Sequence, residues 1–211
     1  MISSLIFLVI PLISVLLDTC FLERFKKNSA LSEDLNILIN EAGFELLVHP
    51  YVYENEMSVL AYAKPLFEKD YCRVVKYDEF IPDDLFREYY KSIFLKIYNE
   101  FYDRLMAMGS LKAEKMKRLE DDSDIFSVRY AGSSIGDVHL VLMALFMGVP
   151  IILSEDNNDM RMIYDIASSR INSGSFQLIM YQVSDVVELI RNKDNRTISG
   201  KELKRLRRAY S

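Results

Sequence analysis

The stretch SVLLDTCFLERF, residues 14–25, determines how the whole chain is interpreted. In one interpretation LLDTC is a lipoprotein cleavage box, and Cys20 carries a membrane anchor. In the other, Leu17 ends a buried strand and Asp18 lies at the tip of that strand, where it can bind a metal ion. Asp18 and Thr19 stand where a cleavage box requires small or aliphatic residues. The sequence therefore favours the strand.

The apolar run that leads into this stretch, ISSLIFLVIPLISVLL, is close in length to a signal-peptide core or a short membrane span. No Lys or Arg precedes it, so the charged region that begins a signal peptide is missing. Pro11 divides the run, which is more natural between two short segments than inside one helix. We therefore expect a cytoplasmic protein with no membrane partner, and export or anchoring is the alternative.

The composition is that of an ordinary globular protein. Of 211 residues, 50% are hydrophobic and 27% are charged, so the chain can form one domain with a substantial core. The formal net charge of −5 gives no general attraction to nucleic acid, so such binding needs a local basic surface. Cys20 and Cys72 are far apart in the sequence, which predicts neither a disulfide framework nor a zinc site.

Short runs rich in Val, Ile and Leu alternate with longer helical patterns. This alternation is typical of a mostly parallel sheet with helices on both faces. We predict an α/β fold with three α/β/α layers around a central sheet of about five strands. The expected strands are residues 13–17, 44–48, 73–77, 149–154 and 176–181.

Helical patterns fill the segments between these strands. The first predicted helix has Ser32 as its N-cap, acids in its first turn and Gly43 at its C-terminal end. The next begins near Tyr51 and stops before Pro65. Three more are expected: from after Ile135 to Gly148, from near Asn158, and from after Ser184.

The segment of residues 83–122 contains no clear strand signal. Its aromatic and aliphatic residues recur every three or four positions, which predicts one long amphipathic helix followed by a charged one. We interpret it as a helical insertion within a single domain, residues 1–211, with its apolar face packed on that domain. Residues 199–211 predict a short basic helix, either a solvated surface or a contact for phosphates.

Four acids fall where predicted strands end and helices begin: Asp18, Glu56, Asp137 and Asp156. Taken singly, an Asp at such a junction is often an N-cap or a turn former, and Glu56 a solvated helix residue. Together, four carboxylates at one edge of a sheet would raise one another's pKa unless a cation neutralised them. Oxygen ligands without Cys or His among them predict Mg²⁺ or Mn²⁺.

Three segments, ISVLLDTCFL, HPYVYENEM and SSIGDVHLVLMALFMGVPIILSEDNND, resemble in order and spacing the acidic motifs of PIN-domain nucleases. The chain is longer than the small PIN toxins of toxin-antitoxin pairs, mainly through its helical middle, which the resemblance covers poorly. The resemblance to these nucleases implies a PIN-like domain in which the catalytic metal ligands are Asp18, Glu56, Asp137 and Asp156. Asp159 is a further candidate ligand, and Ser154 and Asn158 are candidate supporting groups.

The resemblance also implies an activity. It is that of a metal-dependent endoribonuclease that hydrolyses phosphodiester bonds of single-stranded or structured RNA with Mg²⁺ or Mn²⁺, leaving 5'-phosphate and 3'-hydroxyl ends. A protein antitoxin or a second copy of the chain is a possible partner. Three residues depart from the family pattern. Cys20 replaces an Asn, which would weaken support of Asp18; Glu54 competes with Glu56; and Asn158 stands where an acid is common.

Two other functions are open. A catalytically weak PIN-like binding or toxin-type module would explain Cys20 and Asn158. A haloacid-dehalogenase-type phosphatase would explain IILSEDNND, which resembles its last motif, but the family needs an Asp where Cys20 stands. Of the remaining polar residues, we expect His139 to pack or lie on the surface, Cys20 to be a small buried hydrophobe, and His49 to lie near the site.

Overall fold

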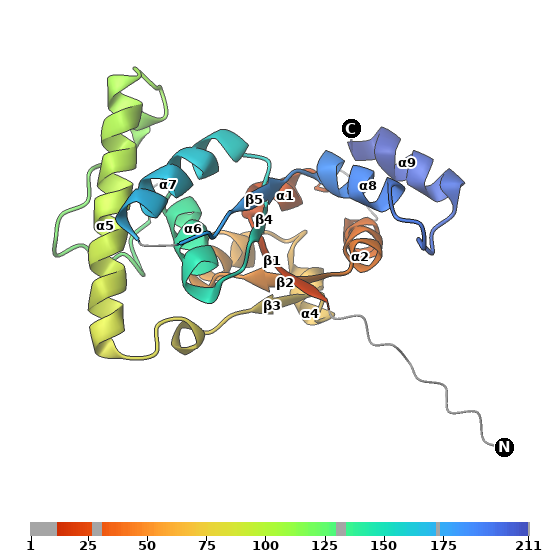
Figure 1. Cartoon of the computed structure of the whole chain (residues 1–211), viewed down its shortest axis with the longest axis horizontal. Helices are drawn as coiled ribbons and strands as arrows, with labels where there is room; N and C mark the ends of the chain where they lie inside the picture. The colour runs from red at the N-terminus through yellow and green to blue at the C-terminus, as the bar shows by residue number, and fades with distance from the viewer. Residues whose placement is uncertain (1–11, 27–30, 130–133, 172–173, 211) are drawn as a thin grey trace.

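Five parallel strands form one sheet at the centre of the molecule (Figure 1). This computed structural model describes residues 12–26, 31–129, 134–171 and 174–210. The strands are β1 (Ile13–Leu17), β2 (Phe44–Val48), β3 (Cys72–Val74), β4 (Ile151–Leu153) and β5 (Ile179–Tyr181). Their order in the sheet is β3-β2-β1-β4-β5, and every pairing is parallel. The predicted α/β class and its five-stranded sheet are confirmed.

β1 and β2 have their predicted bounds, whereas the other three strands are shorter than predicted. β3 lies at one edge of the sheet, and the chain leaves it for a 3-10 helix, Tyr77–Glu79, in which the Glu79 carboxylate accepts from the Lys76 N–H (2.9 Å). β4 begins after Pro150, which has no N–H to donate to a neighbouring strand. β5 lies at the other edge and pairs with β4 alone, so its length matches that of β4.

Helices cover both faces of the sheet (Figure 1). One layer contains α2 (Leu31–Ala42), α8 (Val183–Arg191) and α9 (Gly200–Tyr210), and α8 contacts both of the others. The other layer contains α5 (Asp84–Ala107), α6 (Ile135–Met147) and α7 (Asn157–Arg170), which contact one another. Three helices are short: α1 (Thr19–Glu23) follows β1, α3 (Pro50–Asn55) follows β2, and α4 (Lys64–Glu68) precedes β3.

Glycines end two helices as predicted. Gly43 follows α2 with φ +79° and Gly148 follows α6 with φ +68°, a left-handed conformation that glycine adopts without steric cost. α8 begins at Val183, slightly before its predicted start after Ser184, because the Asp185 carboxylate accepts from the main-chain N–H of Gln182 (2.9 Å) and caps the helix.

Two helix predictions were wrong. The helix expected from Tyr51 to before Pro65 is divided into α3, a 3-10 turn at Met57–Val59, and α4, which contains Pro65 in its first turn. Proline is tolerated there because the first N–H groups of a helix have no partner within it. The charged helix expected after α5 does not form among the described residues. Gly109 turns the chain with φ +66°, and only a 3-10 turn at Ala113–Lys115 comes after it.

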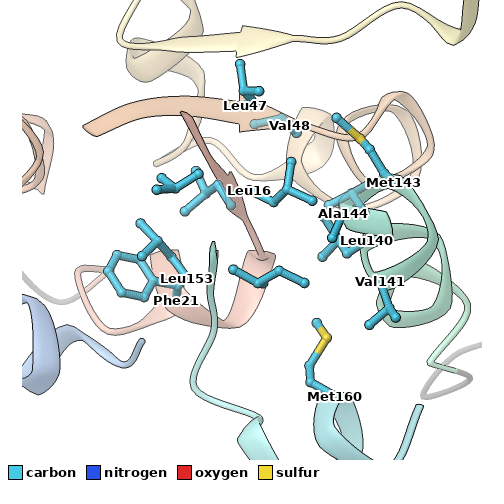
Figure 2. Close-up of a cluster of buried hydrophobic side chains, with 14 of the residues drawn as sticks. Leu16, Phe21, Leu47, Val48, Leu140, Val141, Met143, Ala144, Leu153 and Met160 are labelled. Atoms are coloured by element: carbon cyan, nitrogen blue, oxygen red, sulfur yellow. The ribbon is translucent and has the colours of Figure 1, made fainter. Parts of the chain in front are cut away.

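The long helix α5 is a structural part of the domain. Its aromatic residues Tyr90, Phe94, Tyr98 and Phe101 are fully buried, and α5 contacts both α6 and α7. Its apolar face therefore packs on the domain, as expected. Beneath this layer, side chains of β1, β2 and β4 meet those of α6 and α7 in the core, with Leu140, Met143 and Ala144 of α6 near Leu16 and Val48 (Figure 2).

The C-terminal helix α9 is also docked. Leu203, Leu206 and Tyr210 are buried, Arg205 forms an ion pair with the buried Asp34, and Arg207 lies 3.5 Å from Glu188. Two basic side chains of α9, those of Arg205 and Arg207, thus form ion pairs within the fold, and phosphate contact by this helix stays a prediction.

Among the residues that the structure describes, no helix is both long and apolar enough to cross a membrane. The part of the N-terminal apolar run up to Pro11, on which the alternative of export or anchoring depends, lies outside the described residues.

Candidate active site

A pocket of about 470 Å³ opens at the carboxyl ends of β1 and β4. The chain runs from β1 to β2 and β3 on one side of the sheet, and β4 and β5 lie on the other side of β1. In an open parallel sheet, loops separate at such a reversal of strand order and leave room for a ligand. All four predicted acids, Asp18, Glu56, Asp137 and Asp156, line this pocket.

Asp18 is the most enclosed of these acids, with 5% of the residue exposed. The register between β1 and β4 pairs Leu17 with Leu153, and the Asp18 N–H donates to the Leu153 carbonyl (3.0 Å). Its Oδ2 accepts from Ser154 Oγ (2.8 Å) and from Cys20 Sγ (2.6 Å). Burial raises the pKa of Asp18, and these hydrogen bonds oppose the rise.

Ser154 connects the ends of β1 and β4. Its fully buried hydroxyl donates to Asp18 and accepts from the main-chain N–H of Asp156 (3.0 Å). Cys20 supports the same carboxylate, since its thiol receives the N–H of Glu155 (3.0 Å) and donates to Asp18. Burial and the neighbouring Asp18 raise the pKa of the Cys20 thiol. Cys20 is therefore a donor to the first carboxylate, a role that its interpretation as a small hydrophobe had missed.

Glu56 caps the C-terminal end of α3 and is oriented by Thr19, whose hydroxyl donates to Oε2 (2.7 Å). Burial, opposed by the Thr19 hydrogen bond and aided by the charge of Asp18, raises the pKa of Glu56 to about 7. Gly136 lies directly against this carboxylate, because a Cβ at that position would be 2.2 Å from Glu56 Oε1. Glu54, its competitor in the sequence, is exposed and is not part of the pocket lining.

Asp137 lies in the first turn of α6, with 16% of its side chain exposed. Burial raises its pKa to about 8, and Asp18 adds to the rise while Lys112 opposes it. Asp156 is the N-cap of α7 and accepts from the Asp159 N–H (3.4 Å). Its side chain is 44% exposed, so it is the most open of the four acids in this pocket.

Lys112 is a residue of the pocket that sequence reasoning missed. Its Nζ forms an ion pair with Asp159 and lies 3.6 Å from Asp156 Oδ2 and 3.9 Å from Asp137 Oδ2. Burial alone would lower the pKa of Lys112, but these three carboxylates raise it. Asp159 is therefore linked to Asp137 and Asp156 by an ammonium that all three carboxylates share. Asn158 is exposed on α7 and is not among the residues that line the pocket.

Neither histidine is part of the pocket lining. His139 is fully buried on α6, bonded to the Tyr90 hydroxyl (2.9 Å) and the Ile125 carbonyl (3.0 Å), so it packs the insertion onto the domain as expected. Burial lowers the pKa of His139 to about 3. His49 caps α3 by accepting the Tyr51 N–H at Nδ1 (2.9 Å), and burial holds its pKa well below the usual range.

The donor set fits a hard divalent cation. Asp18, Glu56 and Asp137 line one pocket, and burial raises the pKa of each, so a cation in the pocket would stabilise their ionised forms. As the described side chains stand, however, no three His, Cys, Asp or Glu residues form a ready metal-binding group. The chemistry and position of the acids suit Mg²⁺ or Mn²⁺, and binding requires their side chains to converge further.

Comparison of the chain with known protein families, with curated protein sequences and with solved structures gives no match. The resemblance to PIN-domain nucleases is thus carried by the acidic motifs and their order.

Proposed function

We propose that the protein is a divalent-metal-dependent nuclease that hydrolyses phosphodiester bonds of RNA. One observation carries the proposal: four acids from separate segments of the chain share a pocket at the point where the strand order reverses. The pKa values of Glu56 and Asp137 are raised to about 7 and about 8, so a divalent cation would favour their ionised forms at neutral pH, and the pKa of Asp18 is raised in the same direction.

Asp18, Glu56 and Asp137 would hold the metal, and Asp156 would complete the site at its more open side. A bound Mg²⁺ or Mn²⁺ supplies charge neutralisation at the phosphate and a lowered pKa for a bound water. Ser154 and Cys20 fix the orientation of Asp18, and Thr19 does the same for Glu56.

Glu56 is also suited to proton transfer. Without a bound ion its pKa is about 7, and coordination would lower that value, so Glu56 would accept a proton from an attacking water only through an oxygen that the ion does not hold. Its Oε2 is bonded to Thr19, which holds the carboxylate in place while the proton arrives. The leaving hydroxyl would take its proton from solvent at the open side of the pocket.

The test is cleavage of a mixed RNA pool by purified protein with Mn²⁺, with Mg²⁺ and with EDTA. Asp137→Asn should abolish metal-dependent cleavage, because it removes one ligand charge in a first-turn position of α6. Asp165→Asn is the matched control, since Asp165 is an exposed acid of α7 outside the pocket, and it should cleave at the rate of the parent. Equal cleavage by the Asp137 variant would refute the proposal.

One observation favours a second function, a PIN-like interaction module of the toxin type. The Lys112 ammonium itself neutralises part of the acidic cluster. If the folded protein cleaves no RNA with either metal, this module becomes the better proposal, and a partner protein or a second copy of the chain would then be sought by co-purification. Hydrolysis of a phosphomonoester instead of RNA would favour the phosphatase.

A further inference from the structure

The acidic pocket has two chemically different halves. In one, Asp18 and Glu56 accept hydrogen bonds from the neutral donors Ser154, Cys20 and Thr19. In the other, the ammonium of Lys112 lies beside Asp156 and forms an ion pair with Asp159, which is not among the residues that line the pocket. Asp137 belongs to both, since its carboxylate interacts with Asp18 and lies 3.9 Å from Lys112 Nζ.

Lys112 is positioned by a loop with its own anchors. Three apolar residues of this loop, at every third position, have buried side chains: Ala113, Met116 and Leu119. The Asn99 side chain of α5 donates to the Leu119 carbonyl (2.9 Å) and accepts from the Leu119 N–H (2.9 Å). These contacts hold the loop that carries the lysine, so that the ammonium reaches the pocket with 30% of its side chain exposed.

An ammonium is a natural substitute for a metal ion at this position. It is a compact point charge that binds carboxylates and phosphates and needs no shell of several oxygen ligands. Two-metal nucleases use their second ion as an additional positive charge at the phosphate. Asp156 and Asp159, with Asp137, provide enough negative charge for one cation here, and Lys112 supplies that cation from within the chain.

We propose that Lys112 fills the second cation position of the site, so that the protein binds a single divalent ion in the half formed by Asp18, Glu56 and Asp137. This inference rests on the proposed function. The Lys112 ammonium, 3.6 Å from Asp156 Oδ2, would then supply the positive charge that a second ion would otherwise supply.

The experiment counts Mn²⁺ ions bound per chain, by calorimetric titration and by electron paramagnetic resonance, without RNA. The parent should bind one ion and give the spectrum of an isolated Mn²⁺. Lys112→Met should bind two ions and give the exchange-coupled spectrum of neighbouring Mn²⁺ ions. The carboxylates that surrounded the lysine would then bind the second ion. Lys112→Arg, which keeps the charge, and Lys115→Met, which removes an exposed lysine of the same loop, should each bind one.

Two results would overturn the inference while leaving the nuclease proposal intact: two ions in the parent, or one ion in Lys112→Met. Absence of Mn²⁺ binding by the folded parent would instead refute the metal site and the inference together. Lys112→Gln provides a second charge-removing variant if the Met variant does not fold, and circular dichroism establishes folding before the ions are counted.

Discussion

Replacing Glu56 by Gln should stabilise the metal-free protein at neutral pH. The folded pKa of Glu56 is about 7, whereas the ordinary value is 4.5. The unfolded chain therefore releases this proton at a lower pH than the folded chain, and the free energy of unfolding falls as the pH rises from about 4.5 to about 7. Gln is neutral throughout and its side-chain carbonyl can still accept from Thr19.

The expected difference in the free energy of unfolding follows from the raised pKa of Glu56. At about 1.4 kcal/mol per pKa unit, the penalty of ionising Glu56 in the folded protein reaches roughly 3 kcal/mol above pH 7. For a chain of this length such a change moves the unfolding midpoint by about 6 to 12 °C. Near pH 4 the two proteins should be equally stable, since Glu56 is then largely protonated in both states.

The assay is urea unfolding of the parent and Glu56→Gln in EDTA at several pH values from 4 to 8. Glu54→Gln is the matched control, because Glu54 is an exposed acid of the same helix, and its effect should not vary with pH by more than ~0.5 kcal/mol. Excess Mn²⁺ should reverse the order of stability, since a ligand that binds the native state stabilises it. A difference between parent and Glu56→Gln that is constant across this pH range would refute the reasoning.

Two further changes test the supports of the acids. Gly136→Ala should displace Glu56, because the added Cβ would lie 2.2 Å from Oε1, and the Mn²⁺-dependent rise in melting temperature should shrink. Gly200→Ala is the control, because no atom of the described residues, its own helix and chain neighbours aside, lies within 4 Å of a Cβ at that position, and it should keep the Mn²⁺-dependent rise of the parent. An equal rise in Gly136→Ala and the parent would contradict the close contact between Gly136 and Glu56. Ser154→Ala should lower the free energy of unfolding by about 1–3 kcal/mol, because it leaves buried polar groups unpaired. Urea unfolding measures this change. A loss below ~0.5 kcal/mol would show that Asp18 does not depend on the Ser154 hydroxyl.

The parts of the fold that could be predicted are those in which local pattern and burial agree. β1 and β2 were predicted with their bounds because each is a mostly apolar run, interrupted only by Ser14 in β1 and by Glu45 in β2, and both lie inside a parallel sheet. The edge strand β3 is shorter than predicted, since Glu79 caps a 3-10 turn that begins where the strand was expected to continue. The single helix expected from Tyr51 to before Pro65 was wrong, because Pro65 lies in the first turn of α4 and so marks a helix start, not a helix end.

The acids of the pocket were also predictable, because Asp18 follows its strand directly and Asp137 lies in a first helical turn. The groups that support them were only partly visible. A hydroxyl at the end of β4, Ser154, was an expected neighbour of a carboxylate, but the thiol of Cys20 was not an expected donor. The role of Gly136 depends on the approach of α6 to Glu56, which no local pattern specifies.

Lys112 shows most clearly why the rest could not be predicted. In the sequence it is one of many charged residues in the insertion. The loop that carries it is held by the buried side chains of Ala113, Met116 and Leu119, and this burial is visible only in the structure. The structure places the Lys112 ammonium beside Asp156 and Asp159, where it neutralises part of their negative charge. Asn158, another residue that the sequence singled out, is exposed and does not line the pocket. Of these two residues, the lysine from the insertion is therefore the one that can change the charge balance of the pocket.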